Sequence, residues 1–381
     1  MSEAANAAEA DVVVVGGGVV GAAVAWFLAR EGVGVTLFER GDIAGEASGA
    51  AAGMLAPLSE ADEDGPLRRR GLESLAGFAE TVAVLRDQTG IDPELVPSGV
   101  LRVAESEADA DRFRRRALTE EGLGLTWLDV AALRSAAPGV SPTLLGAVHA
   151  GAECHVRSPL LVRAYIAAAR QAGAVIRTGC DVRGLLRQGD RVIGVRTSEG
   201  DRSSHVVVIC AGSWSATSAD WLGTRPVPIE PVRGQIVSVD MPTPAFGPIV
   251  WGAGAYLVPK RDGSLVIGAT LERVGFDRRV TATGVRSLLA AAEALVPDLG
   301  GQRFRGAWAG LRPDTPDHLP LIGPMPGIEG VVLAAGHYRN GVLLSPVTGR
   351  LVADGVLGKG WDEAAFLPER FLADPSLARS I

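Results

Sequence analysis

The 381-residue sequence has few cysteines and no excess of basic residues. Cys154, Cys180 and Cys210 lie far apart and form no CxxC pair, which excludes a disulfide framework and a zinc cage and favours a reducing compartment. The formal net charge is −7. The arginine runs 68–70 and 114–116 are short and flanked by acids, so we expect solvated helix faces and no nucleic-acid partner.

Secretory and membrane signals are also missing. The first ten residues carry two glutamates and no basic cluster, the wrong charge pattern for a secretory signal. Residues 12–29 contain no charge, and their length alone would allow a short membrane span. Four glycines interrupt this run, at positions that suggest another purpose. We therefore expect a cytoplasmic protein without a membrane partner.

The uncharged run instead has the pattern of a strand, a helix and a second strand. Val12–Val15 is a short β-branched run typical of a buried parallel strand, and it ends in three consecutive glycines. Residues 19–30 have an apolar stripe at helical spacing, and residues 33–38 return to strand composition. This is a βαβ unit.

Further elements alternate in character along the chain. Helices are expected at 67–89, 107–121, 160–172 and 284–296, with Ser158 as cap and Pro159 as first residue of the third. Strands are expected at 100–104, 146–150, 175–178, 192–197, 206–210 and 331–335, and residues 226–270 read as an antiparallel sheet.

The predicted fold class is α/β plus α+β, in two interleaved domains, because each α/β piece is too short to close a sheet alone. We assign residues 1–80, 151–221 and 307–381 to a Rossmann-like cofactor domain. Residues 81–150 and 222–306 are assigned to an antiparallel-sheet substrate domain.

The glycines after the first strand have the spacing of a dinucleotide-binding fingerprint. Gly16 permits the tight turn, Gly18 allows the backbone to approach a pyrophosphate, and Gly21 allows helix and strand to pack closely. The helix N-terminus then faces the phosphates. Glu39 ends the second strand, where an acid can bind ribose hydroxyls. The alternative is an ordinary glycine-rich turn.

Arg312 is the strongest candidate for binding a substrate. It lies in the apolar segment AGLRP, and a buried unpaired guanidinium is costly, so it needs an anion. A substrate carboxylate bound by two hydrogen bonds would serve, but so would an internal ion pair with Asp314 or Asp317. Tyr256, on an expected strand, could donate a second hydrogen bond to the carboxylate or be an ordinary buried tyrosine.

The segment from His337 to Gly341 precedes a predicted helix, with Asn340 as a possible cap. Backbone N–H groups there could stabilise negative charge on a cofactor. Ser345-Pro346 predicts that the helix kinks or starts late. His149, Cys154 and His155 have metal-ligand chemistry but no zinc spacing, so we expect no metal site.

These motifs resemble the D-amino acid oxidase family of flavoproteins, and within it the glycine oxidases of thiamine biosynthesis. The similarity is carried by GGGVVG (16–21), SGAAAGML (48–55), VVVICAGSWS (206–215), YLVPK (256–260), AGLRPDTPD (309–317) and GHYRNGVLLSP (336–346). It implies noncovalent FAD, dioxygen as acceptor and a small amino acid or amine as substrate. Hydride would pass from the substrate α-carbon to flavin N5, giving an imine, then glyoxylate, ammonia and hydrogen peroxide. We also expect a homo-oligomer.

Carried over residue by residue, the resemblance places Arg312, Tyr256 and Arg339 at the substrate. It places the following residues at FAD: Gly16, Gly18, Val19, Val20, Gly21, Glu39, Arg40, Ala47, Ser48, Ala52, Gly53, Met54, Val182, Ala211, Gly212, Trp214, His337, Tyr338, Arg339, Asn340, Gly341, Val342 and Leu343.

Three alternatives follow from these residues. Sarcosine oxidase or D-amino acid dehydrogenase activity is suggested by Gly254, where some glycine oxidases have a histidine, because a roomier pocket admits other amines. Many sarcosine oxidases carry a flavin-linking cysteine at about Gly310, and its absence here indicates noncovalent FAD. A nicotinamide dehydrogenase would leave residues 307–345 unexplained. The remaining class is a subunit that binds FAD without turnover.

Overall fold

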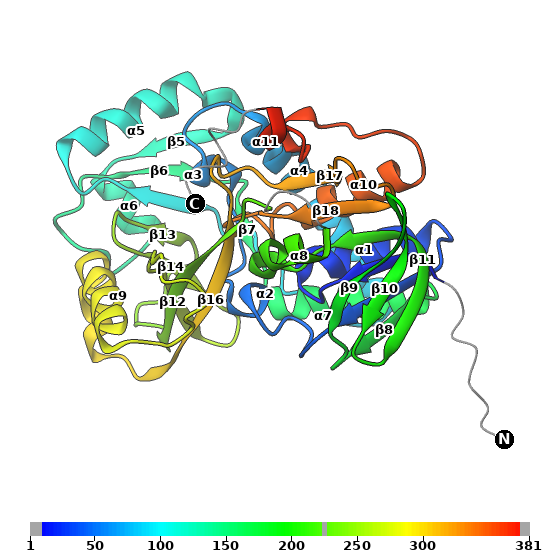
Figure 1. Ribbon diagram of the computed structural model, residues 1–381. Helices are drawn as coiled ribbons and strands as arrows, with labels where there is room; N and C mark the ends of the chain where they lie inside the picture. Colours follow the sequence, from blue (N-terminus) through cyan, green and yellow to red (C-terminus); the bar gives the residue numbers. More distant parts are fainter. Residues whose placement is uncertain (1–9, 223–226, 374–381) are drawn as a thin grey trace.

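The computed structural model describes residues 10–222 and 227–373. The charge pattern of the first nine residues lies outside these ranges, as do the first and last residues of the predicted cofactor domain. Within them, the strands form two eight-stranded sheets and one two-stranded sheet. Figure 1 shows the two large sheets side by side, with the beginning and end of the described chain in the same half.

The first large sheet has a parallel centre. Its order is β17-β18-β11-β1-β2-β8, where β17 alone pairs antiparallel, and β10 and β9 extend β11 as an antiparallel meander. The strands are β1 (Ala10–Val15), β2 (Val35–Glu39), β8 (Val175–Thr178), β9 (Val182–Gln188), β10 (Arg191–Thr197), β11 (Gly200–Ile209), β17 (Leu321–Pro324) and β18 (Val331–Ala335).

Three helices pack together in this half of the molecule: α1 (Val19–Arg30), α7 (Ser158–Gln171) and α10 (Ser345–Val356). They share one hydrophobic core with alternate residues of the central strand, Val12 and Val14, while Val13 and Val15 belong to a second core on the opposite face. This alternation is the two-residue period of a strand buried on both faces. The predicted βαβ unit is confirmed.

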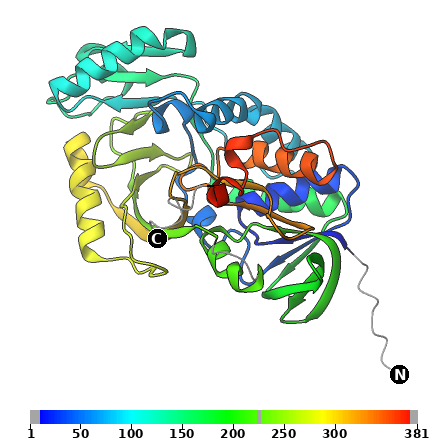
Figure 2. The same ribbon diagram turned by 45° about the horizontal axis from the view of Figure 1, so that its top comes forward.

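The second large sheet is mostly antiparallel, in the order β16-β12-β15-β14-β13-β4-β6-β5, with one parallel pair, β13 and β4. The strands are β4 (Val100–Val103), β5 (Leu125–Leu128), β6 (Ala147–Ala150), β12 (Glu230–Asp240), β13 (Ile249–Trp251), β14 (Tyr256–Pro259), β15 (Ser264–Gly268) and β16 (Phe304–Asp314). Its flanking helices are α5 (Glu107–Thr119), α6 (Val130–Ala136) and α9 (Ala282–Leu295). Figure 2 shows α5 and α9 on the side away from the first sheet.

Short elements fill the junction between the two sheets. They are α2 (Ala47–Ala50), α3 (Pro57–Glu60), and β3 (Met54–Leu55), which pairs with β7 (Cys154–His155). The longer helix α4 (Pro66–Thr89) follows, and α8 (Ala219–Leu222) and α11 (Arg370–Ala373) lie later in the chain.

The predicted fold class is confirmed by the combination of a mixed parallel sheet with an antiparallel one. Residues 307–314, which we assigned to the cofactor domain, belong to β16 and pair with β12. The domain boundaries themselves stay a prediction.

Two local expectations are wrong. Ser158 is the first residue of α7 rather than its cap, because its hydroxyl donates to the carbonyl of Ser48 at 2.6 Å and Arg157 occupies the cap position. The arginine runs lie on α4 and α5 as expected, but Arg68 and Arg116 are only 5% and 8% exposed. Both are buried because they make ion pairs with Glu120.

No helix among the described residues is both long and apolar enough to cross a membrane. The uncharged run 12–29 forms β1 and most of α1, which are core elements.

Candidate active site

A cavity lies between the two sheets, lined by residues from widely separated parts of the chain. At one end are the glycine-rich loop and the end of β2; at the other are β12, β14 and β16 of the second sheet. The predicted site residues that line it are Gly16, Gly18, Val19, Val20, Glu39, Arg40, Ala47, Ser48, Ala52, Gly53, Met54, Val182, Ala211, Gly212, Trp214, Tyr256, Arg312, His337, Tyr338, Arg339, Asn340, Gly341 and Val342.

The three fingerprint glycines differ in what surrounds them. Gly16 has φ +110°, which L side chains rarely adopt, and a Cβ there would lie 2.5 Å from the Cys210 carbonyl oxygen. A Cβ at Gly21 would strike the Gly16 carbonyl, so this glycine allows close helix packing and does not line the cavity. Gly18 is the cap residue of α1, and its nearest obstacle is the Ser48 hydroxyl, 3.1 Å away. The loop therefore leaves backbone exposed to the cavity.

Two side chains hold this loop. The Ser48 hydroxyl accepts a hydrogen bond of 2.9 Å from the N–H of Val19, the first residue of α1. The Glu39 carboxylate accepts from the N–H groups of Gly17 at 2.7 Å and Gly41 at 2.8 Å. Ser48 thus satisfies a backbone donor at the N-terminus of α1, where anions are stabilised, and Glu39 joins the glycine-rich loop to the turn after β2.

Stacked side chains form the part of the cavity wall near β9. The Arg40 guanidinium lies 4.1 Å from the ring centroid of Trp214, and Phe276 packs on the same indole at 5.3 Å. Val182 is the first residue of β9 and is buried. Planar side chains and exposed backbone of this kind suit a nucleobase.

The segment 47–54 crosses the middle of the cavity and approaches β16 closely. A Cβ at Gly310 would lie 2.7 Å from the Ala50 Cβ, and the Trp308 indole donates to the Ala50 carbonyl at 3.0 Å. Gly53 adopts φ +81°. The mostly small residues of segment 47–54 therefore lie between the two ends of the cavity and leave room for an extended, flat group.

Arg312 projects from β16 into the far end of the cavity. Its Nη1 donates to the Thr270 carbonyl at 3.1 Å. Asp314 is paired with Arg273 at 3.0 Å and His318 at 2.7 Å, and Asp317 is paired with Arg370 at 2.7 Å. Across residues 10–222 and 227–373, both candidate internal partners are thus used by other side chains, and the ion-pair alternative for Arg312 fails.

Two glycines make room for the predicted substrate-binding side chains. A Cβ at Gly234 on β12 would overlap the guanidinium of Arg312, and a Cβ at Gly268 on β15 would overlap the phenol of Tyr256. Glycines inside strands mark such close approaches, which is the signal that our reading of the sequence missed.

The Tyr256 phenol, at the same end of the cavity as Arg312, remains protonated. Burial raises the pKa of its phenol, although the nearby Arg312 charge opposes that rise. The hydroxyl is therefore a hydrogen-bond donor at neutral pH.

Glu60, at the end of α3, lines the same end and was not predicted. Its side chain is 8% exposed, and its Oε2 lies 2.6 Å from Nη2 of Arg339. Burial raises the pKa of this carboxyl, while Arg339, Arg312 and Arg102 act to lower it. Only the tertiary structure brings the four groups together, so no local pattern marked this glutamate.

The loop before α10 differs from expectation. α10 starts late, at Ser345, as predicted, but its cap is Leu344, so Asn340 does not cap it. The N–H groups of Tyr338 and Asn340 bond to the carbonyls of Pro313 and His337, both at 2.8 Å, and cannot face a cofactor. Tyr338 has φ +47°, a costly conformation for an aromatic residue that is found mostly at functional sites.

His337 supports this loop from behind. Burial lowers the pKa of His337 to about 3, and its Nε2 pairs with the Thr348 hydroxyl at 2.9 Å. The neutral ring joins the loop to α10.

Leu343 and Gly254 do not line the cavity. Leu343 is buried, and its carbonyl accepts from Ser74 at 2.6 Å. A Cβ at Gly254 would lie 3.0 Å from the Ala291 Cβ of α9, so our expectation that this glycine enlarges the substrate pocket is wrong.

The residues with metal-ligand chemistry have other surroundings. His155 Nδ1 lies 3.3 Å from the Lys260 ammonium, and burial together with that charge lowers the pKa of His155 to about 3. Among the residues that the structure describes, no group of three or more His, Cys, Asp or Glu could hold a metal ion.

Similarity to known proteins decides the family. The model of the FAD dependent oxidoreductase family, DAO, matches residues 11–355. The chain belongs to this family. It is 39% identical to the glycine oxidase of Geobacillus kaustophilus over 97% of both chains, and 36% identical to that of Pseudomonas aeruginosa over 91% of this chain and 95% of the relative.

Solved structures agree. The glycine oxidase structure from Geobacillus kaustophilus superposes with a TM-score of 0.91 at 38% identity, covering 95% of this chain and 99% of the other. The glycine oxidase structure from Bacillus cereus gives 0.87 at 35% identity, over 92% and 96%. The cofactor of the family is FAD, and the chain is a glycine oxidase-like, FAD-dependent amino acid oxidase.

Proposed function

We propose that the enzyme oxidises glycine and other small amino acids, with dioxygen as the final electron acceptor. The observation that carries this proposal is the cluster of Arg312, Tyr256, Arg339 and Glu60 at one end of a cavity whose other end is the glycine-rich loop. Asp314 and Asp317 are paired with other side chains, so the Arg312 guanidinium is available to bind a substrate carboxylate. Gly234 on β12 leaves room for that guanidinium at the cavity.

The predicted FAD contacts fit the cavity that they line. The pyrophosphate would face the N-terminus of α1 beside Gly18 and Ser48, and the ribose would lie near Glu39. Trp214 and Arg40 would border the nucleobase. We infer noncovalent binding, because a Cβ at Gly310 would already lie 2.7 Å from the Ala50 Cβ, which leaves no space there for a larger linking residue.

The protein residues bind and orient the substrate. Arg312 would hold the carboxylate through two parallel N–H donors, and the Tyr256 hydroxyl would donate a further hydrogen bond. Together these contacts fix the direction of the α-carbon, and alignment of this kind lowers the barrier without covalent chemistry by the protein. FAD, when bound, supplies the hydride acceptor for the α-carbon hydrogen and the site of reaction with dioxygen. The resulting imine hydrolyses to an α-keto acid and ammonia.

A role in thiamine biosynthesis is supported by a second kind of relative. The "Bifunctional protein ThiO/ThiG" of Nostoc sp. is 34% identical over 90% of this chain, which spans 52% of that relative. Supply of an imine or its hydrolysis product for thiazole assembly would be consistent with this similarity.

Other substrates are the main alternative. An iminodiacetate oxidase structure superposes with a TM-score of 0.85 at 27% identity, over 94% of this chain, so secondary amines such as sarcosine belong in any test.

The test is a substrate panel of glycine, sarcosine, D-alanine, D-proline and iminodiacetate under air, with hydrogen peroxide and α-keto acid measured together. We expect glycine to give peroxide and glyoxylate in equal amounts, with a kcat/KM at least equal to that of the other substrates. No peroxide from glycine, with rapid turnover of another amine, would overturn the assignment of substrate.

A further inference from the structure

Glu60 is a buried acid with an incomplete set of partners. Its Oε2 is fully buried and, among the residues that the structure describes, has no hydrogen-bond partner of good geometry, although Arg339 Nη2 lies 2.6 Å away. The carboxylate also lines the cavity. A buried acceptor left without a donor is unfavourable, so such a group is expected to receive one from a ligand.

The charges around the substrate end match a zwitterion. Arg312 and Arg339 supply two positive charges and Glu60 one negative charge. The other acids that line the cavity are Glu39, Glu46 and Asp181, and each has another partner. Glu39 bonds to the N–H groups of Gly17 and Gly41, Glu46 pairs with Arg278 at 2.7 Å, and Asp181 pairs with Arg183 at 3.6 Å. A bound carboxylate would occupy Arg312, which leaves Glu60 as the acid nearest to a substrate ammonium.

The backbone on both sides of Glu60 is held by the side chains of Glu153 and Arg116. Glu153 accepts from the N–H groups of Leu58 at 2.6 Å and Ser59 at 2.9 Å, and also from the Ser59 hydroxyl. Arg116 donates to the Leu58 carbonyl at 2.6 Å and pairs with Asp62 at 2.7 Å.

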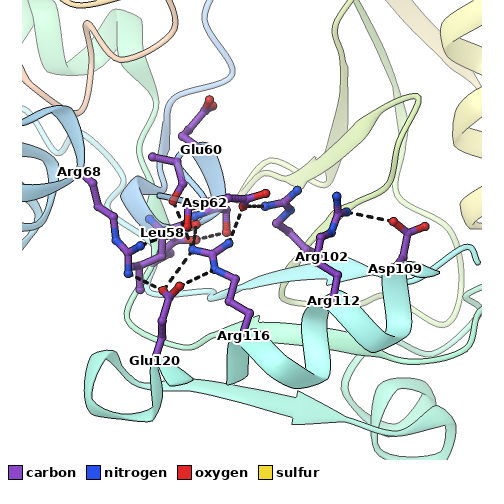
Figure 3. A network of polar contacts seen from close by, with 12 residues as sticks. Leu58, Glu60, Asp62, Arg68, Arg102, Asp109, Arg112, Arg116 and Glu120 are labelled. Carbon is purple, nitrogen blue, oxygen red and sulfur yellow. Dashed lines mark hydrogen bonds and ion pairs between the residues drawn. The ribbon is translucent and has the colours of Figure 1, made fainter. Parts of the chain in front are cut away.

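Figure 3 shows this network from close by. Arg68, Arg102 and Arg116 gather around Asp62 and Glu120, and the Glu60 carboxylate points away from them. The segment is thus fixed on both sides of Glu60, and the side chain between is directed to the cavity. This arrangement explains why Arg68 and Arg116 are buried, and it has the form of a support that preorganises a functional group.

We propose that Glu60 binds the substrate ammonium group and accepts its proton before the α-carbon is oxidised. The inference rests on the proposed function, since it requires an amino acid in the cavity. In this step one N–H bond of the ammonium breaks and an O–H bond forms on Glu60. The electron pair stays on nitrogen, and the zwitterion becomes an amine that can release hydride from the adjacent carbon.

The electrostatic surroundings decide the pH range of this proton transfer. Glu60 is faced by Arg339 from the loop before α10, Arg312 from β16, Tyr256 from β14, Arg102 from β4 and Glu153 from the segment before β7. Burial raises the pKa of Glu60 and the arginines oppose it, so the carboxylate is a stronger proton acceptor than an exposed glutamate. Ionisation of Glu60 should therefore limit kcat/KM on the acid side.

The experiment compares the wild-type holoenzyme with Glu60→Gln and Glu60→Asp. The rate of flavin reduction by glycine without oxygen is measured as a function of pH. Near neutral pH, Glu60→Gln should lower kcat/KM by about 10²–10⁴-fold, the usual contribution of general acid–base catalysis. The loss should shrink as pH rises, because free glycine then arrives already deprotonated. Glu60→Asp should keep the wild-type profile with a smaller loss.

Two further measurements separate this role from a structural one. Acetate binding, followed by its effect on the flavin spectrum, should be unchanged or tighter in Glu60→Gln, since acetate has no ammonium and Arg312 is intact. Glu63→Gln, an exposed neighbour on the same segment, is the matched control and should resemble wild type in every assay.

The outcomes are distinct. A similar fold-loss for Glu60→Gln at every pH would overturn the inference and leave Glu60 as a partner of Arg339 alone, while the proposed function stands. Failure of glycine to reduce the wild-type flavin at any pH would instead refute the proposed function.

Discussion

Replacing Arg312 separates substrate binding from structural support. Arg312→Ala removes the guanidinium that would hold the carboxylate and leaves the rest of β16 paired with β12. The side chain is half-buried and bonds to the Thr270 carbonyl and the Tyr256 hydroxyl, so the expected loss lies in the lower part of the range for a desolvated charge contact. That is about 2–3 kcal/mol, or roughly 30- to 150-fold in kcat/KM for glycine.

Arg312→Lys keeps the charge but loses the planar pair of donors, so its loss should be smaller and should appear mainly in KM. The assay is anaerobic flavin reduction with glycine beside a primary amine that has no carboxylate. The amine never used the arginine, so its low kcat/KM should stay unchanged in both variants. Equal losses for both substrates, together with a lowered melting temperature, would refute the assignment of Arg312.

Gly268, Glu39 and Glu153 can each be tested by a single substitution. Gly268→Ala should displace the Tyr256 phenol and lower kcat/KM for glycine by up to about 10²-fold, whereas Gly254→Ala, facing α9, should not; equal effects would remove Tyr256 from the substrate site. Glu39→Ala should weaken FAD retention in a protein that stays folded, and unchanged flavin content after dialysis would show that Glu39 only supports the loop. Burial raises the pKa of Glu153 to about 7 from 4.5, so the folded state binds its proton more tightly than the unfolded state, and this contribution to stability is lost as pH rises from about 4.5 to about 7. Over this interval the stability of Glu153→Gln relative to wild type should therefore increase, by at most about 3 kcal/mol. Thermal unfolding of both proteins is compared at pH 5 and pH 8. If the difference in stability between variant and wild type is the same at both pH values, the raised pKa is contradicted.

Local patterns predicted the elements that depend on local physics. The run from Val12 to Phe38 combines a β-branched strand, glycines at fixed spacing and an apolar helical stripe, and each part is determined by neighbours in the chain. Gly16 and Gly21 behave as the fingerprint predicts, since a Cβ at Gly16 would strike the carbonyl of Cys210, directly after β11, and a Cβ at Gly21 would strike the carbonyl of Gly16.

The features that were missed depend on distant contacts. Glu60 is one acid among several in an acidic segment, and only the network around Arg116 distinguishes it. Arg68 and Arg116 looked solvated because each has a distant partner, Glu120 for Arg68 and Asp62 for Arg116, although Arg116 also pairs with Glu120 on the next helical turn. Ser158 has the chemistry of a cap, but the Ser48 carbonyl, 110 residues away, competes for its hydroxyl. Gly234 and Gly268 matter because of side chains on neighbouring strands.

The proposed function requires glycine to transfer hydride to bound FAD in this cavity. The most direct measurement is the absorbance of the oxidised flavin when glycine is added to the holoenzyme without oxygen. We expect glycine to bleach the flavin completely, air to restore the colour with formation of hydrogen peroxide, and acetate to perturb the spectrum without bleaching. An oxidised spectrum that persists at saturating glycine, in a protein that retains its FAD, would contradict the proposed function.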